Sequence, residues 1–85
     1  MNRVPKKALG ERFLKVYSIG DYISWKSFLD YRSIEGYYEV HYGIITGFVR
    51  ETETGREIIM VKVLPIQSTI PVEIHINRIR KVETN

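Results

Sequence analysis

Cysteine is absent from this chain of 85 residues. Its absence excludes disulfide bonds, thiolate catalysis and thiolate metal sites, and it suits a reducing compartment. No apolar run approaches the roughly 18 residues of a membrane-spanning helix. The basic N-terminal stretch is not followed by the apolar segment of a secretory signal. We therefore expect an intracellular protein without a membrane segment.

Motifs for catalysis are missing as well. The two histidines, His41 and His75, stand alone in the sequence, so neither predicts a metal site. No serine lies in a Gly-x-Ser-x-Gly context, and no glycine-rich phosphate loop is present. Carboxylates concentrate at Glu51, Glu53 and Glu57, in a predicted hairpin turn where solvent leaves a carboxylate unsuited to acid–base work. The sequence predicts no enzyme, no metal, no cofactor and no small-molecule substrate.

The composition is that of one small globular domain, with 44% hydrophobic and 12% aromatic residues. The net charge of +3 is unevenly distributed. Residues 1–20 hold five basic side chains and one acidic one, or +4, whereas residues 21–85 hold eight and nine, or −1. Residues 1–11 also contain Pro5 and Gly10, which break regular structure. We expect a flexible basic N-terminal arm over 1–11 and a single domain over 12–85.

The stretch 17–26 organises the predicted domain. A turn at Gly20-Asp21 leads into a strand in which Ile23 and Trp25 point to one face. Tyr22, Ser24 and Lys26 point to the other face, and we place Trp25 in the core. For residues 13–18 the alternation favours extended structure. The competing interpretation is a helix over 6–16, because Leu9, Phe13 and Val16 recur at helical spacing.

Further strands follow after a long, tyrosine-rich connection at 27–40, which we interpret as an ordered loop or irregular hairpin. Strands are predicted at 41–50, 57–64 and 71–76, with a single helical turn at 77–79 and a closing strand at 80–83. Gly43 and Gly47 inside a strand indicate a bulge or bend, and Gly55 indicates a tight turn with positive φ. Five strands in this arrangement predict an all-β fold, a small five-stranded SH3-like barrel with a short N-terminal extension. An OB-fold would need a longer helix than any segment here supplies.

Four segments carry a resemblance to a known family: Gly20-Asp21-Tyr22-Ile23-Ser24-Trp25-Lys26-Ser27, Gly43-Ile44-Ile45, Gly55-Arg56 and Val61-Lys62-Val63. Over residues 19–83 the chain resembles short, uncharacterised SH3-like barrel proteins of tailed bacteriophages. It departs from their pattern in the N-terminal arm, in the insertion at 28–40, and at Val61, where alanine is frequent. The resemblance implies a phage-encoded protein in the cytoplasm of an infected bacterium or in the virion. It implies no catalytic residues.

Tyrosines and one apolar strand face are the candidate partner-binding features. Tyrosine is enriched at binding hot spots. The face of strand 57–64 that should meet solvent carries apolar side chains, which either the N-terminal arm or a partner covers, unless strong coiling of the sheet buries both faces. The candidate partner-binding residues are Tyr31, Tyr37, Tyr38, Tyr42, Ile58 and Met60. They predict a protein-interaction or assembly module that binds another protein or itself.

Binding of nucleic acid is the alternative. Cations of the arm and of the segment 78–81 would contact phosphates in a salt-dependent, sequence-independent way, and exposed tyrosines would stack on single-stranded bases. The candidate nucleic-acid-binding residues are Arg3, Lys6, Lys7, Arg12, Lys15, Arg78, Arg80 and Lys81.

Overall fold

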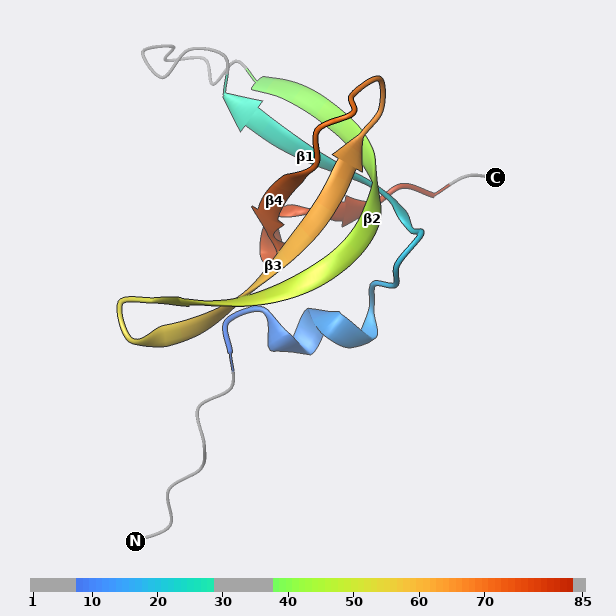
Figure 1. Ribbon diagram of the computed structural model, residues 1–85. Coiled ribbons are helices and arrows are strands. Elements are labelled where there is room, and N and C mark those ends of the chain that lie inside the picture. The colour runs from blue at the N-terminus through green and yellow to red at the C-terminus, as the bar shows by residue number, and fades with distance from the viewer. Residues whose placement is uncertain (1–7, 29–37, 84–85) are drawn as a thin grey trace, which may run out of the picture.

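The computed structural model describes residues 8–28 and 38–83. These residues form five β-strands and two short 3-10 helices, so the predicted all-β class is confirmed (Figure 1). In chain order the elements are η1 (Glu11–Lys15), β1 (Tyr22–Phe28), β2 (Tyr38–Glu53), β3 (Arg56–Pro65), β4 (Val72–His75), η2 (Ile76–Arg78) and β5 (Arg80–Lys81). No helix in the described part of the chain has the length and apolar character to cross a lipid bilayer.

The five strands form one antiparallel sheet in the order β4-β3-β2-β1-β5. β2 is the longest strand, with 16 residues, and it bends strongly along its length (Figure 1). Its first part pairs with β1 and its later part with β3. Because the bend turns the two parts of the sheet toward each other, β1 and β5 lie opposite β3 and β4. No strand pairing among the described residues joins the edge strands β4 and β5, so the sheet is not closed.

Three of the predicted glycine positions explain the bend and the hairpin. The β2–β3 register shifts between Ile45 and Gly47, which confirms an irregularity at Gly47. At Gly43 a Cβ would lie 2.5 Å from Val63 Cγ1, so glycine is needed for close approach to β3. The β2–β3 turn has positive φ at Thr54 and at Gly55, as expected for a tight hairpin.

The core lies on the concave side of the curved sheet. The alternation expected in a half-buried strand is present in β1 and β3: Ile23 is buried near the start of β1, and Ile59, Val61 and Val63 are buried along β3. Ile74 and Ile76 are buried as expected, whereas Val72 is 36% exposed at the start of β4. Trp25 is half-buried and packs against the core rather than within it.

The prediction of extended structure over 13–18 is wrong, because residues 11–15 form the helix η1. Before it, Leu9 forms a parallel bridge with Ile58 through two hydrogen bonds: Leu9 N donates to Glu57 O at 2.8 Å, and Ile59 N donates to Leu9 O at 2.9 Å. Gly10 then adopts a left-handed conformation that turns the chain away from β3. The turn brings Phe13 and Leu14 against the core, and this burial outweighs the local alternation.

Part of the predicted arm therefore lies on the sheet. Ala8 is buried and Leu9 is bound to β3. Arg50 connects η1 to the hairpin: its guanidinium donates to Glu11 at 2.9 Å and to Glu57 at 3.3 Å. The Glu11 carboxylate, followed by that of Glu57, raises the pKa of Arg50, although partial desolvation opposes them. Residues 1–7 lie outside the described part of the chain.

The segment after η1 is tied to the C-terminal strand. The Tyr17 hydroxyl donates to Ile79 O at 3.0 Å in a buried hydrogen bond between residues 62 positions apart. Lys81 Nζ donates to Val16 O at 3.1 Å and lies 3.4 Å from the Asp21 carboxylate. These contacts hold β5 against β1.

Candidate functional site

The outer face of β1 and β2 carries a row of exposed apolar side chains. Tyr38, Val40 and Tyr42 alternate along β2 and are 50%, 38% and 44% exposed. Tyr22 of β1 stacks on Tyr42, with ring centroids 5.9 Å apart. The outer faces of antiparallel sheets are commonly polar where they meet solvent. This face is apolar instead.

The row continues onto the end of β3. Leu64 pairs with Ile44 of β2 and is 37% exposed. Ile66 donates its backbone N–H to Tyr42 O at 2.9 Å and is 50% exposed. A hollow of about 290 Å³ lies between β2 and the turn after β3, where Tyr42 and Ile66 line it. We call this surface the tyrosine face; it comprises Tyr22, Tyr38, Val40, Tyr42, Leu64 and Ile66.

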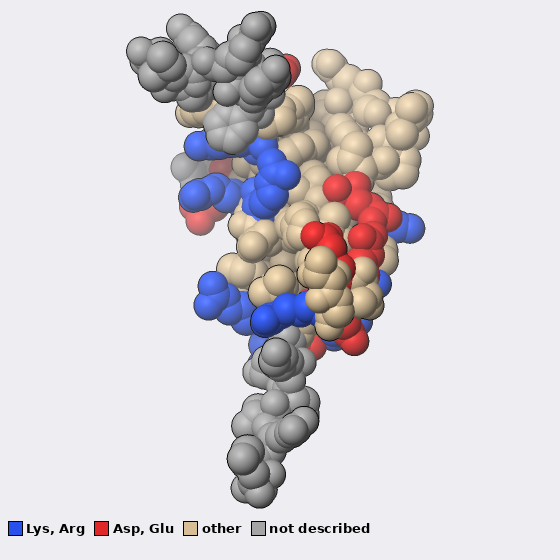
Figure 2. All heavy atoms as spheres, turned by 90° about the vertical axis from the view of Figure 1, so that its left-hand side faces the viewer, with Lys and Arg blue, Asp and Glu red and all other residues tan. Residues whose placement is uncertain are grey.

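A second hollow, the basic groove, lies beside β1 where β5 and η2 meet it. It has a volume of about 300 Å³, and its lining residues are Ser24, Trp25, Lys26, Val40, Asn77, Arg78 and Arg80. The cations Lys26, Arg78 and Arg80 are all exposed, and none of the lining residues is acidic. In Figure 2, a group of Lys and Arg side chains lies in the upper left part of the view, and the larger group of Asp and Glu side chains lies to its right.

Strand pairing and one hydrogen bond assemble the basic groove. Ser24 of β1 pairs with Arg80 of β5, which places Arg80 and Lys26 on the same outer face. Arg78, at the end of η2, donates from Nη2 to Lys26 O at 2.9 Å. Lys26 Nζ in turn lies 4.4 Å from the centroid of the Tyr38 ring. The groove thus joins cations from three elements to an aromatic ring.

A partly buried group on the inner face of the β1–β2 ladder consists of Trp25, Ser27 and His41. The Trp25 and His41 rings stack with centroids 5.4 Å apart, and Ser27 Oγ lies 2.7 Å from His41 Nε2. A serine beside a histidine resembles a nucleophile and its base, which also require a group that orients the base. No carboxylate of residues 8–28 and 38–83 is hydrogen-bonded to His41. Sequence reasoning missed this pair, because Ser27 and His41 are 14 positions apart.

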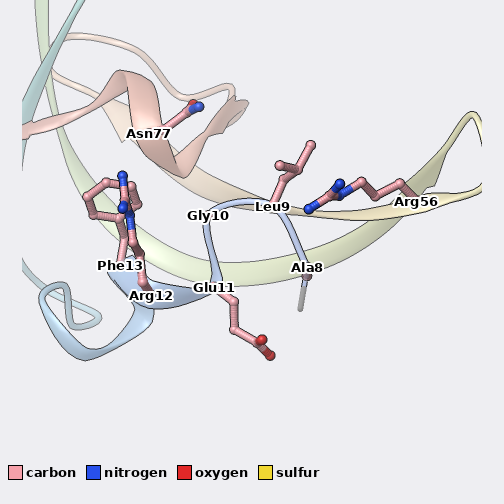
Figure 3. Close-up of a pocket in the computed structure, with 8 residues that line it drawn as sticks. All are labelled: Ala8, Leu9, Gly10, Glu11, Arg12, Phe13, Arg56 and Asn77. Atoms are coloured by element: carbon pink, nitrogen blue, oxygen red, sulfur yellow. The ribbon is translucent and has the colours of Figure 1, made fainter. Parts of the chain in front are cut away.

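A third hollow, of about 700 Å³, lies between the N-terminal segment and η2. Figure 3 shows Arg56 extending toward Leu9, and Arg12 beside the Phe13 ring. The Arg12 guanidinium lies 4.9 Å from the centroid of that ring. Of the residues that line this hollow, Arg12 alone was predicted as a site residue. The sequence therefore did not predict a site here.

Carboxylates gather instead on the outer side of β2 and β4. A hydrogen bond with the Glu73 carboxyl, and then the negative charge of Glu73, raise the pKa of Glu51. Glu53 adds to this effect and His75 opposes it. The side chains of Glu51, Glu53 and Glu73 are all exposed. No three His, Asp or Glu side chains of the described ranges gather as metal ligands would.

The predicted partner-binding residues do not form one surface. Tyr38 and Tyr42 share the tyrosine face. Ile58 is only 5% exposed, so the structure does not present it as a contact residue. It lies beside Leu9 in the parallel bridge, in agreement with the first of the explanations given above. Met60 is half-buried on β3. Tyr31 and Tyr37 lie outside the described residues.

The predicted nucleic-acid-binding residues separate in the same way. Arg78 and Arg80 lie in the basic groove, whereas Lys81 turns toward Asp21. Arg12 and Lys15 are exposed on η1. Arg3, Lys6 and Lys7 lie outside the described residues. Sequence reasoning missed Lys26, although it had placed that side chain on the outer face; nothing in the sequence shows that β1 pairs with β5.

We infer the function of this chain from the geometry of two surfaces. The tyrosine face offers apolar and aromatic contacts, and the basic groove offers cations beside an aromatic ring. No family model, no curated protein and no solved structure matches the chain.

Proposed function

We propose that this chain is a non-enzymatic SH3-like barrel that acts as a protein-interaction or assembly module, and that it docks onto another protein through the tyrosine face. Support for the barrel comes from the strand order, from the long bent β2 that both parts of the sheet share, and from the one-turn helix η2 before a short last strand. The resemblance to phage proteins supports a phage-encoded module.

The continuous exposed apolar row on the tyrosine face carries the docking proposal. Three consecutive outward positions of β2 are apolar or aromatic and more than a third exposed, and two further exposed apolar side chains of β3 and its turn lie beside them. Contiguous exposed apolar surface marks binding sites on soluble proteins. Tyrosine buries a large area with little loss of conformational entropy, which makes it an effective anchor.

Site-specific photocrosslinking in the cells that naturally make the protein tests this function. A photoreactive phenylalanine analogue at position 42 should give one defined adduct with another protein, identified by mass spectrometry. The same analogue at Lys62, an exposed position of β3 outside the tyrosine face, is the matched control and should not give that adduct. Equal adducts from both positions would contradict docking through this face.

Two variants distinguish docking from a loss of folding. Tyr42→Ala and Ile66→Ala each remove an exposed side chain, so unfolding in urea should change by only about 0.5 kcal/mol. The adduct from a probe at position 38 should nevertheless fall at least several-fold in either variant, because these side chains supply adjoining contacts. If the adduct contains only a second copy of the chain, sedimentation velocity will show dimers, and the protein-partner proposal is replaced by self-association.

A further inference from the structure

The basic groove joins cations that sequence distance keeps apart. Lys26 lies on β1, and Arg78 and Arg80 lie more than 50 positions later, on η2 and β5. Their head groups are exposed, and among the described residues no carboxylate lies within ion-pair distance of any of the three. By contrast, Arg50 and Lys81 elsewhere on the surface have carboxylate partners. The groove thus concentrates positive charge that no described acidic side chain neutralises.

One aromatic ring borders the same groove. The Tyr38 ring is half exposed and lies beneath Lys26 Nζ, at 4.4 Å from ring centroid to nitrogen. Trp25 also lines the groove, but its ring stacks on His41 and packs against the core on the inner face of β1. A ring held next to cations offers a stacking surface for an unpaired base together with a contact for its phosphate.

The chemistry of the groove favours a single strand over a duplex. The exposed Tyr38 ring can stack only on a base whose face is free, as in a single strand. No acidic residue lines the groove to repel a phosphate. An acidic peptide would satisfy the cations but would leave Tyr38 without a planar stacking partner.

We propose that the basic groove is a binding site for single-stranded nucleic acid, in which Lys26, Arg78 and Arg80 contact phosphates and Tyr38 stacks on a base. This site lies beyond the proposed docking function: its cations Lys26, Arg78 and Arg80 take no part in docking, and only Tyr38 and Val40 are shared with the tyrosine face. Its failure would leave docking through Tyr42 and Ile66 unaffected.

Fluorescence anisotropy of the full chain with labelled dT15 and rU15, at about 50 and 200 mM salt, tests the proposal. We expect micromolar binding at the lower salt that weakens steeply at the higher salt, as phosphate contacts do. Lys26→Gln and Arg80→Gln should each lower the slope of log K against log salt by about 0.7, the value for one phosphate contact on a single strand. Arg78 is not varied, because it also donates to Lys26 O.

Matched controls separate the groove from general surface charge. Lys62→Gln removes another exposed strand lysine, outside the groove, and should leave the salt slope unchanged. Tyr38→Ala should weaken binding about tenfold or more, whereas Tyr38→Phe, which keeps the ring, should bind like the natural chain. Unfolding of both variants in urea is measured in parallel, so that a loss of binding caused by unfolding of Tyr38→Ala is recognised as such.

Several outcomes would overturn the proposal. They are the absence of binding at 50 mM salt, equal effects of Lys26→Gln and Lys62→Gln, or equal binding of a 15-base-pair duplex. Competition by poly-glutamate as effective as that by unlabelled dT15 would instead identify a site for acidic protein segments. A preference between dT15 and rU15 supports the proposal in either direction and identifies the sugar that the groove accepts.

Discussion

Gly10 shows how one backbone position determines where the N-terminal segment lies. Its φ of 86° is in the left-handed region, and a Cβ at this position would overlap Ile76 Cγ2. Glycine therefore permits both the turn into η1 and the close approach to η2. The segment can cover β3 only because this residue has no side chain.

Gly10→Ala should destabilise the protein by about 2 to 4 kcal/mol, since left-handed backbone and overpacking each cost an alanine about 1 to 3 kcal/mol. Urea unfolding monitored by Trp25 fluorescence measures the loss. Gly47→Ala is the control, because a Cβ there meets no described atom within 4 Å and its φ is not positive. An equal loss in both variants would mean that Gly10 has no special role.

At the scale of the element, β3 is the strand on which the others depend. It pairs with β2 on one side and β4 on the other, and near the hairpin Leu9 adds a further bridge. Both faces are buried at consecutive residues, Ile58 and Ile59, whereas toward the end of the strand only Val61 and Val63 are buried and Leu64 is exposed. The N-terminal segment produces this difference between the two halves of the strand.

Ile58→Ala should therefore cost about 2 to 4 kcal/mol of stability, as expected when a large side chain is removed from a core. Leu64→Ala, at an exposed position on the same face of the same strand, should cost about 1 kcal/mol or less. Urea unfolding of the two variants checks the comparison. If Ile58→Ala were harmless to folding yet abolished association, Ile58 would be a contact residue after all.

For the whole molecule, the decisive contacts are those that join the segment after η1 to β5 and the residue before it. The buried hydrogen bond from Tyr17 to Ile79 and the bond from Lys81 to Val16 fix β5 against β1. β5 has only two residues, so strand pairing alone would hold it weakly. These tethers also position the segment that brings Arg78 and Arg80 to the basic groove.

Tyr17→Phe should lower stability by about 1 to 2 kcal/mol, because it removes one hydrogen bond and leaves the Ile79 carbonyl without that donor in a buried place. Amide hydrogen exchange at Arg80 and Val82 should accelerate more than exchange at Val61 in the centre of the sheet. Tyr38→Phe, which removes an exposed hydroxyl, serves as the control. Uniform acceleration across the sheet would show that the bond is not a local tether.

The two proposed surfaces adjoin each other across the whole molecule. Val40 belongs to the tyrosine face and also lines the basic groove. Tyr38 is likewise part of the tyrosine face and is the ring that the groove presents to a base. A protein bound on one surface and a nucleic acid bound on the other would therefore compete for Tyr38.

The sequence by itself determined the strands, because strand alternation is a local property. The period of two in β1 and β3, the turn at Gly55 and the irregularity at Gly47 were all readable from residue types. It also singled out Tyr38 and Tyr42, which are exposed, and Arg78 and Arg80, which line one groove. Each of these depends on neighbours within a few positions.

Only the tertiary structure decided the rest, since it depends on pairing between distant segments. The helix η1 replaced an expected strand because Phe13 and Leu14 gain burial against the core. Ile58 is buried beside the Leu9 bridge, so it does not lie on an exposed surface. The basic groove exists because β1 pairs with β5 and brings Lys26 to Arg78, 52 positions away. Such pairings depend on the free energy of the whole fold. A local sequence pattern therefore does not reveal them.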